Sequence, residues 1–330
     1  MKIEIFRRTV KDRKNGASFQ LLKHMEAGAR ACGDEPVMVN GKLTGEWQKD
    51  EMEPTAPIGC MFGYGGKNQQ HHTKGRRRDL VERAKKKGIY IITFDGGILS
   101  SFGNTITHPR HHWRVSLYSP MNNGNFLSDN SPSDRWDMMK DLWNIKYEPW
   151  RKSNQDDPIL FGLQPKDNWS MDELDPIEWF NGVYEKLRPA TDRKFLIRPH
   201  PNHMAQMIKR RNEFPEDCEL VEGPTSFVGD EKKHYRFNLQ EALANCHAFV
   251  THNSTASVDS CVRGIPTFVT SDLAICWTVA NTNLNNIETP EYPDRTQWVH
   301  DIGYKMWSTD EIRNGTVLKR FKEKLGLGNA

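Results

Sequence analysis

Short apolar runs alternate with longer amphipathic stretches along this chain of 330 residues. The runs IEIF at 3–6, GIYIITF at 88–94 and PILFGLQ at 158–164 have the length and apolar character of buried strands. Between the runs lie stretches with helical spacing, such as 76–87 and 176–187. This alternation is typical of α/β proteins, in which helices cover parallel sheets. We therefore expect an α/β fold.

The alternation is interrupted once, near the middle of the chain. Residues 122–157 are rich in Asn, Ser, Pro and Asp, and a single amphipathic stretch at 134–144 breaks them. We expect a linker there. The chain is long enough for two domains of ordinary size. The sequence therefore predicts two Rossmann-like domains, residues 1–150 and 151–307, that face a cleft in which ligands bind at the carboxyl ends of the strands.

Composition and charge exclude several classes of protein. No run approaches 18 apolar residues, and residues 1–12 lack the apolar stretch of a secretory signal, so we expect a cytoplasmic protein. None of the six cysteines has metal-ligand spacing, and we expect reduced, buried thiols. The net charge is only +3, but basic residues cluster at 76–78, 85–87 and 209–211. Such clusters fit a solvated helix face or an anion-binding surface equally well.

The stretch HAFVTHNSTASVDSCVRGIPTFV at 247–269 is the strongest candidate for an anion site. An apolar strand leads into hydroxyl and amide side chains at the start of a helix, where free N–H groups and partial positive charge stabilise a phosphate. The same side chains would also serve as ordinary helix caps. Asp259 lies five residues before Gly264 on this helix. A carboxylate there can accept hydrogen bonds from ribose hydroxyls.

Two further loops are expected at the same edge of the second sheet. Arg198 and His200, in the turn RPHP, directly follow a predicted strand. Their side chains can contact a diphosphate, although a structural ion pair would explain the arginine too. Gln164 and Ser170 lie in the loop after the first strand of the second half. They are candidates for hydrogen bonds to donor phosphates.

These motifs resemble a known group of enzymes. The RPHP turn, the unit HNSTASVDSCVRGIPTF and the tail DRTQWVHDIGYKMWSTDEIRNG at 294–315 together resemble capsule-type and phage-type GT-B glycosyltransferases, including those that glycosylate hydroxymethylated bases in viral DNA. The stretches HHWRVSLYSP at 111–120 and SDRW at 133–136 look like the same phage-type group. The resemblance implies the GT-B fold, with the donor bound by the second half and the acceptor by the first. It also implies a C-terminal helix, at about 308–330, that packs back on the first domain.

The resemblance also implies roles for individual residues. An Asp stands at 259 where this group more commonly has a Glu that holds the ribose. The expected donor-binding residues are Gln164, Ser170, Arg198, His200, His252, Asn253, Ser254, Thr255, Asp259 and Arg263. The expected acceptor-binding residues are Gly65, Gly66, Arg76, Arg77, Arg114 and Ser116.

The implied reaction is the transfer of a sugar from a nucleotide sugar, expected to be a UDP-sugar, to the hydroxymethyl group of a pyrimidine in double-stranded DNA. Hydroxymethylcytosine and hydroxymethyluracil are both possible acceptors, and the basic clusters of the first half would contact the phosphate backbone. Such enzymes commonly invert the anomeric carbon and need neither a metal nor a cofactor, because basic side chains stabilise the departing diphosphate. Consistent with this, no D-x-D triplet follows a predicted strand, and His108, His111 and His112 match no zinc-ligand spacing.

An inverting transfer needs a general base. Asp95 ends a predicted strand and precedes two glycines that leave room for a substrate, so it is the first candidate. An ordinary turn residue would have the same neighbours. His71, His72 and Asp12 are the competing candidates for the base.

Three alternatives remain open at this stage. The acceptor can be a surface polysaccharide or a lipid-linked saccharide instead of DNA. The same fold also serves nucleotide-sugar 2-epimerases, which need no acceptor. A non-catalytic DNA-binding protein is the third, but the chain has no helix-turn-helix, zinc-finger or homeodomain pattern.

Overall fold

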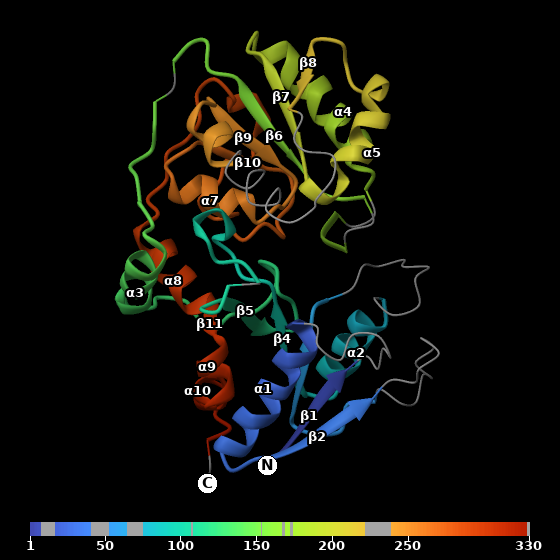
Figure 1. Cartoon of the computed structure of the whole chain (residues 1–330), viewed down its shortest axis with the longest axis vertical. Helices are drawn as coiled ribbons and strands as arrows, with labels where there is room; N and C mark the ends of the chain where they lie inside the picture. Colours follow the sequence, from blue (N-terminus) through green and yellow to red (C-terminus); the bar gives the residue numbers. More distant parts are fainter. Residues whose placement is uncertain are drawn as a thin grey trace. The chain divides into compact units, whose positions relative to one another are not determined.

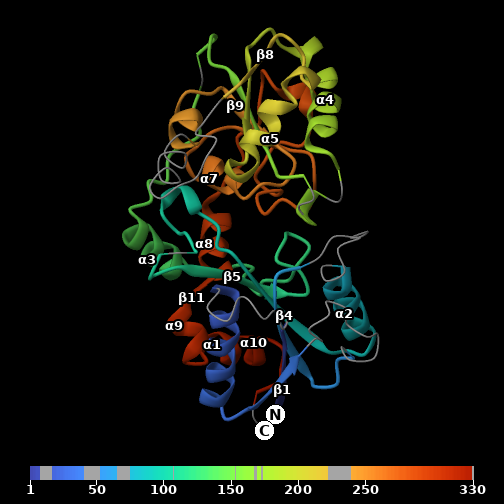
Figure 2. The same cartoon turned by 45° about the vertical axis from the view of Figure 1, so that its right-hand side comes forward.

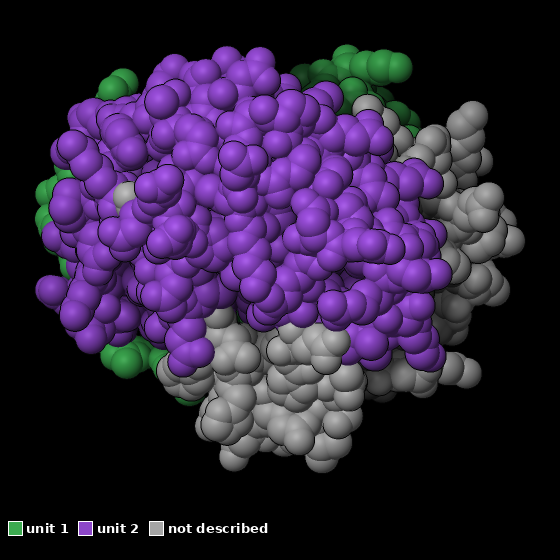
Figure 3. All heavy atoms as spheres, turned by 90° about the horizontal axis from the view of Figure 1, so that it is seen from above, with its two compact units in different colours: residues 1–98, 104–138, 299–330 green, residues 99–103, 139–298 purple. Residues whose placement is uncertain are grey.

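The computed structural model describes residues 1–7, 17–40, 53–64, 75–106, 108–152, 154–166, 169–171, 174–221 and 239–328. The chain forms two compact units, which are coloured separately in Figure 3. Unit 1 comprises Met1–Ile98, Asn104–Met138 and Val299–Ala330, and unit 2 comprises Leu99–Gly103 and Met139–Trp298. Each unit has its own sheet and is described by itself.

The sheet of unit 1 has six strands in the order β11-β5-β4-β3-β1-β2. Its strands are β1 (Lys2–Arg7), β2 (Glu35–Asn40), β3 (Ile58–Phe62), β4 (Tyr90–Asp95), β5 (His112–Leu117) and β11 (Met306–Ser308). The first four are parallel, as apolar runs separated by helices require. At the other edge β5 is antiparallel to β4, and β11 is antiparallel to β5. The sheet is therefore mixed, whereas the sequence predicted parallel strands.

Helices from both ends of the chain cover this sheet. They are α1 (Ala17–Ala31), α2 (Gly75–Lys86), α9 (Thr309–Arg313) and α10 (Thr316–Lys324). α1 lies beside α9 and α10 in Figures 1 and 2. The crossing is close at Gly28, where an added Cβ would come within 2.1 Å of the Ile312 carbonyl oxygen. The core beneath them includes Ile5, Leu21 and Phe321.

The C-terminal segment is not the single helix that the sequence predicted at about 308–330. It divides at Gly315, which has a φ of 84° and separates α9 from α10. This left-handed backbone conformation favours glycine and ends the first helix. Lys322 on α10 then forms a buried ion pair with Asp34, at 2.9 Å.

Unit 2 contains a five-stranded parallel sheet in the order β10-β9-β6-β7-β8. Its strands are β6 (Ile159–Leu163), β7 (Phe195–Pro199), β8 (Cys218–Leu220), β9 (Ala248–Thr251) and β10 (Thr267–Val269). The chain adds β7 and β8 on one side of β6 and then returns to add β9 and β10 on the other side. The order therefore reverses at β6. In open α/β sheets, the crevice at the carboxyl ends of the strands beside such a reversal is where ligands bind.

The helices of unit 2 pack on both faces of its sheet. They are α4 (Pro176–Leu187), α5 (Met204–Lys209), a helical stretch at 239–244 and α7 (Ala256–Val262). One core includes Phe161, Phe180 and Phe195. A second, on the opposite face, includes Leu243 and Phe249. Helices α3 (Asp134–Trp143) and α8 (Thr296–Lys305) each contain one of the unit boundaries.

Six short 3₁₀ turns complete the secondary structure of the described residues. They are η1 (Ser100–Phe102), η2 (Trp169–Met171), η3 (Arg188–Ala190), η4 (Pro201–His203), η5 (Arg211–Glu213) and η6 (Leu284–Asn286). All six cysteines are free. Among the described residues, no helix is long and apolar enough to cross a membrane.

Candidate functional site

A cavity of about 340 Å³ opens in unit 2 at the carboxyl ends of β6 and β7. This is the edge of the sheet where the strand order reverses. Residues from separate parts of the chain surround the cavity. They are Ser100, Ser101, Gly162, Leu163, Arg198, His200, Pro201, Leu239, Phe249, Ser254, Thr255 and Ala256.

Two basic residues form the polar wall on the β7 side. Arg198 lies in register with Gly162 of β6, so its guanidinium is presented at the end of the sheet. The side chain is largely enclosed, because the residue is only 8% exposed. His200 follows at the strand end and also lines the cavity. A guanidinium and an imidazole in one enclosed wall can bind the oxygens of an anion.

Hydroxyl groups lie on the opposite side, between β9 and α7. Ser254 and Thr255 both line the cavity. The Ser254 Oγ accepts a hydrogen bond from the Ala256 backbone N–H at 3.3 Å. Four of the residues predicted to bind the donor, Arg198, His200, Ser254 and Thr255, thus surround one cavity.

Gln164, Ser170 and Asn253 form a buried hydrogen-bond network behind this wall. The Gln164 side-chain amide donates to the Ser170 Oγ at 2.6 Å. The Asn253 backbone N–H donates to the Gln164 Oε1 at 3.1 Å, and its side-chain amide donates to the Ser170 carbonyl oxygen at 2.5 Å. The network fixes the loop between β9 and α7. These three residues are brought together, but they are not among those that line the cavity.

His252 points into a different environment. Its Nδ1 lies 2.9 Å from the Thr270 Oγ1, and the Trp179 indole N–H donates to the same hydroxyl at 2.8 Å. The imidazole also makes an edge contact with the Trp179 ring. In this structure His252 joins β9 to its neighbours, and a role in donor binding stays a prediction.

Asp259 is fully buried on α7 and is not among the cavity-lining residues. Burial raises the pKa of its carboxyl to about 7, while the charge of Arg263 and weak hydrogen bonding from Ser101 oppose that shift. Neither carboxylate oxygen reaches hydrogen-bond geometry with any described residue. Arg263 stacks over the Phe102 ring, with its guanidinium carbon 4.0 Å from the ring centroid. The predicted ribose contact of Asp259 stays a prediction.

The candidate base Asp95 is the last residue of β4, and its carboxylate is already engaged. Its Oδ1 accepts a hydrogen bond from the Gly96 N–H at 2.7 Å. Its Oδ2 lies 3.5 Å from the buried guanidinium of Arg114 on β5. The side chain remains 19% exposed. Arg114, predicted to bind the acceptor, is therefore the charge partner of the candidate base.

Ser116 is fully buried on β5, where it is the register partner of Thr93 on β4. Its hydroxyl donates to the Ser119 carbonyl oxygen at 2.5 Å and lies 2.9 Å from the Thr93 hydroxyl. The structure thus presents no exposed atom of Ser116 to an acceptor.

Several predicted acceptor residues lie outside the described residues. These are Gly65, Gly66 and the competing bases Asp12, His71 and His72, together with the side chain of Arg76. The Arg77 side chain lies against Gly63, where an added Cβ would come within 2.9 Å of its Nη1.

The basic clusters are partly neutralised. Arg83 and Lys87 both pair with Glu53, and Lys85 pairs with Glu82. In the cluster at 209–211, Arg210 pairs with Asp175 and Glu213. These ion pairs reduce the positive charge that either cluster presents to an anion.

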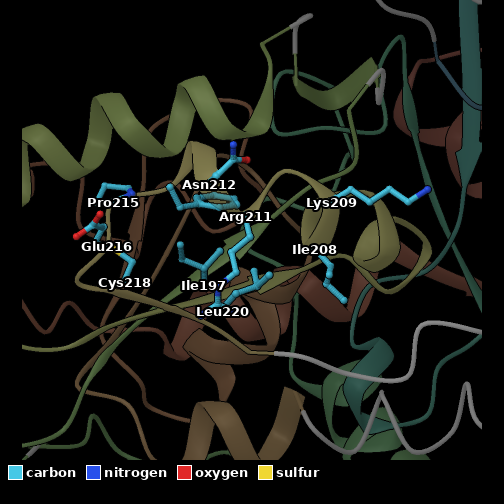
Figure 4. A pocket seen from close by; sticks show the side chains of 10 residues that line it. Ile197, Ile208, Lys209, Arg211, Asn212, Pro215, Glu216, Cys218 and Leu220 are labelled. Carbon is cyan, nitrogen blue, oxygen red and sulfur yellow. The ribbon is translucent and has the colours of Figure 1, made fainter.

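A larger cavity of about 680 Å³ lies beside β7 and β8 (Figure 4). Apolar side chains such as Ile197 and Leu220 form part of its lining, with Lys209 and Arg211 from the basic cluster. None of the predicted site residues lines it. The described residues contain no group of three or more His, Cys, Asp or Glu side chains that could hold a metal ion.

The lining of the smaller cavity includes two polar residues that were not predicted. Ser100 and Ser101 belong to the 3₁₀ turn η1, which follows β4 in the sequence but belongs to unit 2. No local pattern marks them, because only the tertiary structure brings this turn against α7.

The sequence matches no protein-family model and no curated protein. Its structure is similar to that of Thermosulfurimonas dismutans KpsC, a beta Kdo 2,4 transferase, with a TM-score of 0.53 and 13% identity over 96% of this chain and 98% of that one. The beta Kdo 2,7 transferase of the same KpsC gives a TM-score of 0.52 and 9% identity over 97% and 100% of the two chains. The UDP-GlcNAc 2-epimerase of Methanocaldococcus jannaschii gives a TM-score of 0.37 and 11% identity over 99% and 100%. The two transferase structures confirm the α/β fold of the GT-B type that the sequence predicted.

Proposed function

We propose that this chain is a glycosyltransferase that moves a sugar from a nucleotide-sugar donor to a saccharide acceptor. The observation that carries the proposal is the cavity beside β6, which combines Arg198 and His200 with the hydroxyl side chains of Ser254 and Thr255. It lies where ligands bind in open α/β sheets. The similarity of the whole chain to two Kdo transferases supports sugar transfer as the reaction.

The cavity suits the anionic part of a nucleotide sugar. Its volume of about 340 Å³ falls within the range of roughly 300–1,000 Å³ that is usual for small-molecule sites. Arg198 can form paired hydrogen bonds with phosphate oxygens, and His200 adds a further donor. We expect a UDP-sugar, and we infer that these two residues bind its diphosphate.

The reaction that follows is a displacement at the anomeric carbon. The acceptor hydroxyl oxygen forms a bond to that carbon while the bond to the phosphate oxygen breaks, and the nucleoside diphosphate leaves with the electron pair. Arg198 and His200 stabilise the charge that develops on the leaving group. A general base takes the hydroxyl proton, and Asp95 is our candidate. A single displacement of this kind inverts the anomeric carbon, and with two basic side chains at the phosphates we propose that no metal takes part.

For the acceptor, we propose a surface saccharide, which the sequence analysis raised as an alternative to DNA. The sequence resemblance pointed first to hydroxymethylated pyrimidines in DNA. Similarity to two Kdo transferases supports a surface saccharide better. The ion pairs of Glu53 with Arg83 and Lys87 support the same choice, because paired cations contribute less to phosphate-backbone binding.

Mass spectrometry of reaction products tests the proposal. The full chain is incubated with a panel of nucleotide sugars and three acceptor conditions: saccharides, DNA with or without hydroxymethylated pyrimidines, and no acceptor. We expect a mass increase of one sugar on a saccharide. A sugar found on DNA would instead identify hydroxymethylated DNA as the acceptor. In that case DNA binding should also weaken steeply as the salt concentration rises.

The condition without acceptor separates transfer from epimerisation. An epimerase converts the nucleotide sugar to an isomer of the same mass, which chromatography resolves. Isomerisation without an acceptor, or no turnover in any condition, would contradict the proposed transfer.

A further inference from the structure

The loop tip Leu99–Gly103 supplies one wall of the cavity through Ser100 and Ser101. It appears as the teal turn next to α7 in Figures 1 and 2. The tip starts at Leu99, with a left-handed φ of 65°, and closes at Gly103, with a φ of 109°. At its base the Asn104 side chain donates to the Ile98 carbonyl oxygen at 2.8 Å. The chain therefore makes a closed turn, and residues 99–103 form its tip.

Contacts from three directions hold this tip in unit 2. The Gln240 side-chain amide donates to the Ser101 carbonyl oxygen. Arg263 stacks on the Phe102 ring, and Trp143 lies against Gly103, where an added Cβ would meet the indole at 3.4 Å. At the centre of the tip, Ser101 also lies close to Asp259 of α7.

There the buried carboxyl of Asp259 and Ser101 lie close together, and the hydrogen-bonding groups of Ser101 act on the carboxyl from outside good geometry. The Ser101 Oγ and both carboxylate oxygens of Asp259 are buried, and none reaches hydrogen-bond geometry with a described residue. A buried charge without a hydrogen bond is costly, whereas a neutral carboxyl is far less so. The contact between the tip and α7 therefore favours an uncharged Asp259.

We propose that Asp259 is a positioning residue, which in its uncharged form holds the loop tip Leu99–Gly103 against α7 as one wall of the cavity. The seating of the tip is independent of the proposed function, and only its effect on nucleotide binding rests on that function. This role differs from the ribose contact that the sequence predicted for Asp259. It agrees with the burial of Asp259 beside Ser101 and with its absence from the residues that line the cavity.

The charges around Asp259 are few. Arg263 lies on the same helix, and its attraction opposes the effect of burial. The negative charge of Glu148 in turn attracts the guanidinium of Arg263 and favours its protonated form. The neighbouring elements η1, β9 and β10, with sequences SSF, AFVT and TFV, carry no charged side chain. Of these groups, Asp259 is the one whose charge changes near neutral pH, because Arg263 stays protonated there.

The proposal gives the seating of the tip a definite pH dependence. With the tip seated, the pKa of Asp259 is about 7, against an ordinary value of 3.8 when the carboxyl is exposed to water. The pKa of Asp259 is higher when the tip packs against α7 than when the carboxyl is exposed to water. The resulting stabilisation of the packed tip is therefore full below pH 3.8 and is lost as the pH rises through about 7. The equilibrium for seating should thus weaken about tenfold between pH 6 and pH 8.

Hydrogen–deuterium exchange of the peptide covering 97–104 measures the seating without any ligand. After correction for the intrinsic exchange rate, protection of the wild-type peptide should fall about tenfold from pH 6 to pH 8. Asp259→Asn cannot ionise, so its protection should not change with pH. The matched control Asp310→Asn, at a side chain that is 79% exposed, should behave as wild type. Equal protection of the wild type at both pH values, or a tenfold fall in Asp259→Asn, would overturn the proposal.

A second variant keeps the test decisive if Asp259→Asn does not fold. Phe102→Ala removes the contact with Arg263 but keeps the carboxyl. Protection should then be lower at both pH values, with the tenfold ratio retained. Loss of the ratio in Phe102→Ala would show that Asp259 does not govern the seating.

Calorimetry with UDP as the probe connects the tip to binding. Under the proposal, Asp259→Asn binds UDP as well as wild type at pH 6 and at least as well at pH 8. A loss of affinity at both pH values would instead make Asp259 a ligand of the ribose and overturn the positioning role. If wild type does not bind UDP while the exchange results are as expected, the donor assignment fails and the role of Asp259 in the loop tip stands.

Discussion

The carboxylate of Asp95 and the guanidinium of Arg114 lie 3.5 Å apart on adjacent antiparallel strands, where the two residues are direct register partners. Arg114 is buried and has no other charge partner among the ion pairs of the described residues, so Asp95 compensates its charge.

If Asp95 is the base, Asp95→Asn should bind nucleotide normally and lose about 10²–10⁴-fold in turnover. The same change leaves Arg114 without its counter-charge, so the thermal unfolding midpoint should fall as well. Initial-rate kinetics at saturating donor, combined with thermal melts, measures both effects.

Arg114→Met provides the control for that experiment. It breaks the same ion pair but keeps the carboxylate, so it should reduce kcat far less than Asp95→Asn does. If Asp95→Asn keeps near wild-type turnover while His71→Ala, His72→Ala or Asp12→Asn abolishes it, the role of base moves to that residue.

The second prediction concerns the cavity. Arg198→Ala should weaken binding of UDP by about 1.5–3 kcal/mol, the usual contribution of a hydrogen bond to a charged group. Arg211→Ala is the matched control, because Arg211 lines the larger cavity beside β8 and should leave affinity unchanged. Isothermal titration calorimetry makes the measurement, and circular dichroism confirms that both variants fold. Equal affinities in the two variants would remove Arg198 from the donor site.

Much of the fold could be predicted because its signals are local. The helix expected at 176–187 is α4 with the same bounds, and Asp175 caps it through a hydrogen bond to the Ile177 N–H. The parallel strands coincide with apolar runs, since both faces of such a sheet are buried. β5 was missed for the opposite reason. Its buried His112, Arg114 and Ser116 interrupt the apolar pattern, and tertiary contacts rather than hydrophobicity satisfy them.

The candidate site likewise contains residues that local sequence could predict and residues that only long-range contacts bring to it. Arg198, His200, Ser254 and Thr255 follow strands of one sheet, and the rule that parallel strands end at a common edge was enough to place them together. Ser100 and Ser101 could not be found by that rule, because they follow a strand of the other sheet. The surroundings of Asp259 depend on the same long-range contact. Sequence spacing placed it on the right helix but could not give the direction of its carboxylate.

The third prediction concerns stability. Lys322 pairs with Asp34 at 2.9 Å, and their side chains are 6% and 0% exposed. Lys322→Ala should lower the free energy of unfolding by about 3–5 kcal/mol, because it leaves a buried carboxylate with less compensation. The loss of unfolding free energy should lie at the lower end of that range, because the Met1 ammonium group still lies 2.8 Å from the Asp34 carboxylate. Lys319→Ala, at a side chain that is 75% exposed, should change it by no more than about 0.5 kcal/mol. Urea denaturation compares the two variants.

The last prediction concerns the glycine that follows α7. Gly264 has a φ of 71°, and an added Cβ would come within 1.9 Å of the Pro149 carbonyl oxygen. The segment at 148–151 lies across this turn, with backbone hydrogen bonds from Glu148 to Val262 at 3.1 Å and from Arg151 to Gly264 at 2.6 Å. Gly264→Ala should therefore destabilise the fold by about 2–5 kcal/mol, the sum of a left-handed backbone cost and local overpacking. Gly182→Ala is the matched control, because Gly182 lies in α4 with no atom within 4 Å of an added Cβ. It should instead stabilise the fold by about 0.5–1 kcal/mol, since alanine loses less backbone entropy in a helix. Denaturation midpoints of the two variants should thus move in opposite directions. An unchanged or raised midpoint of Gly264→Ala would contradict the need for glycine at 264.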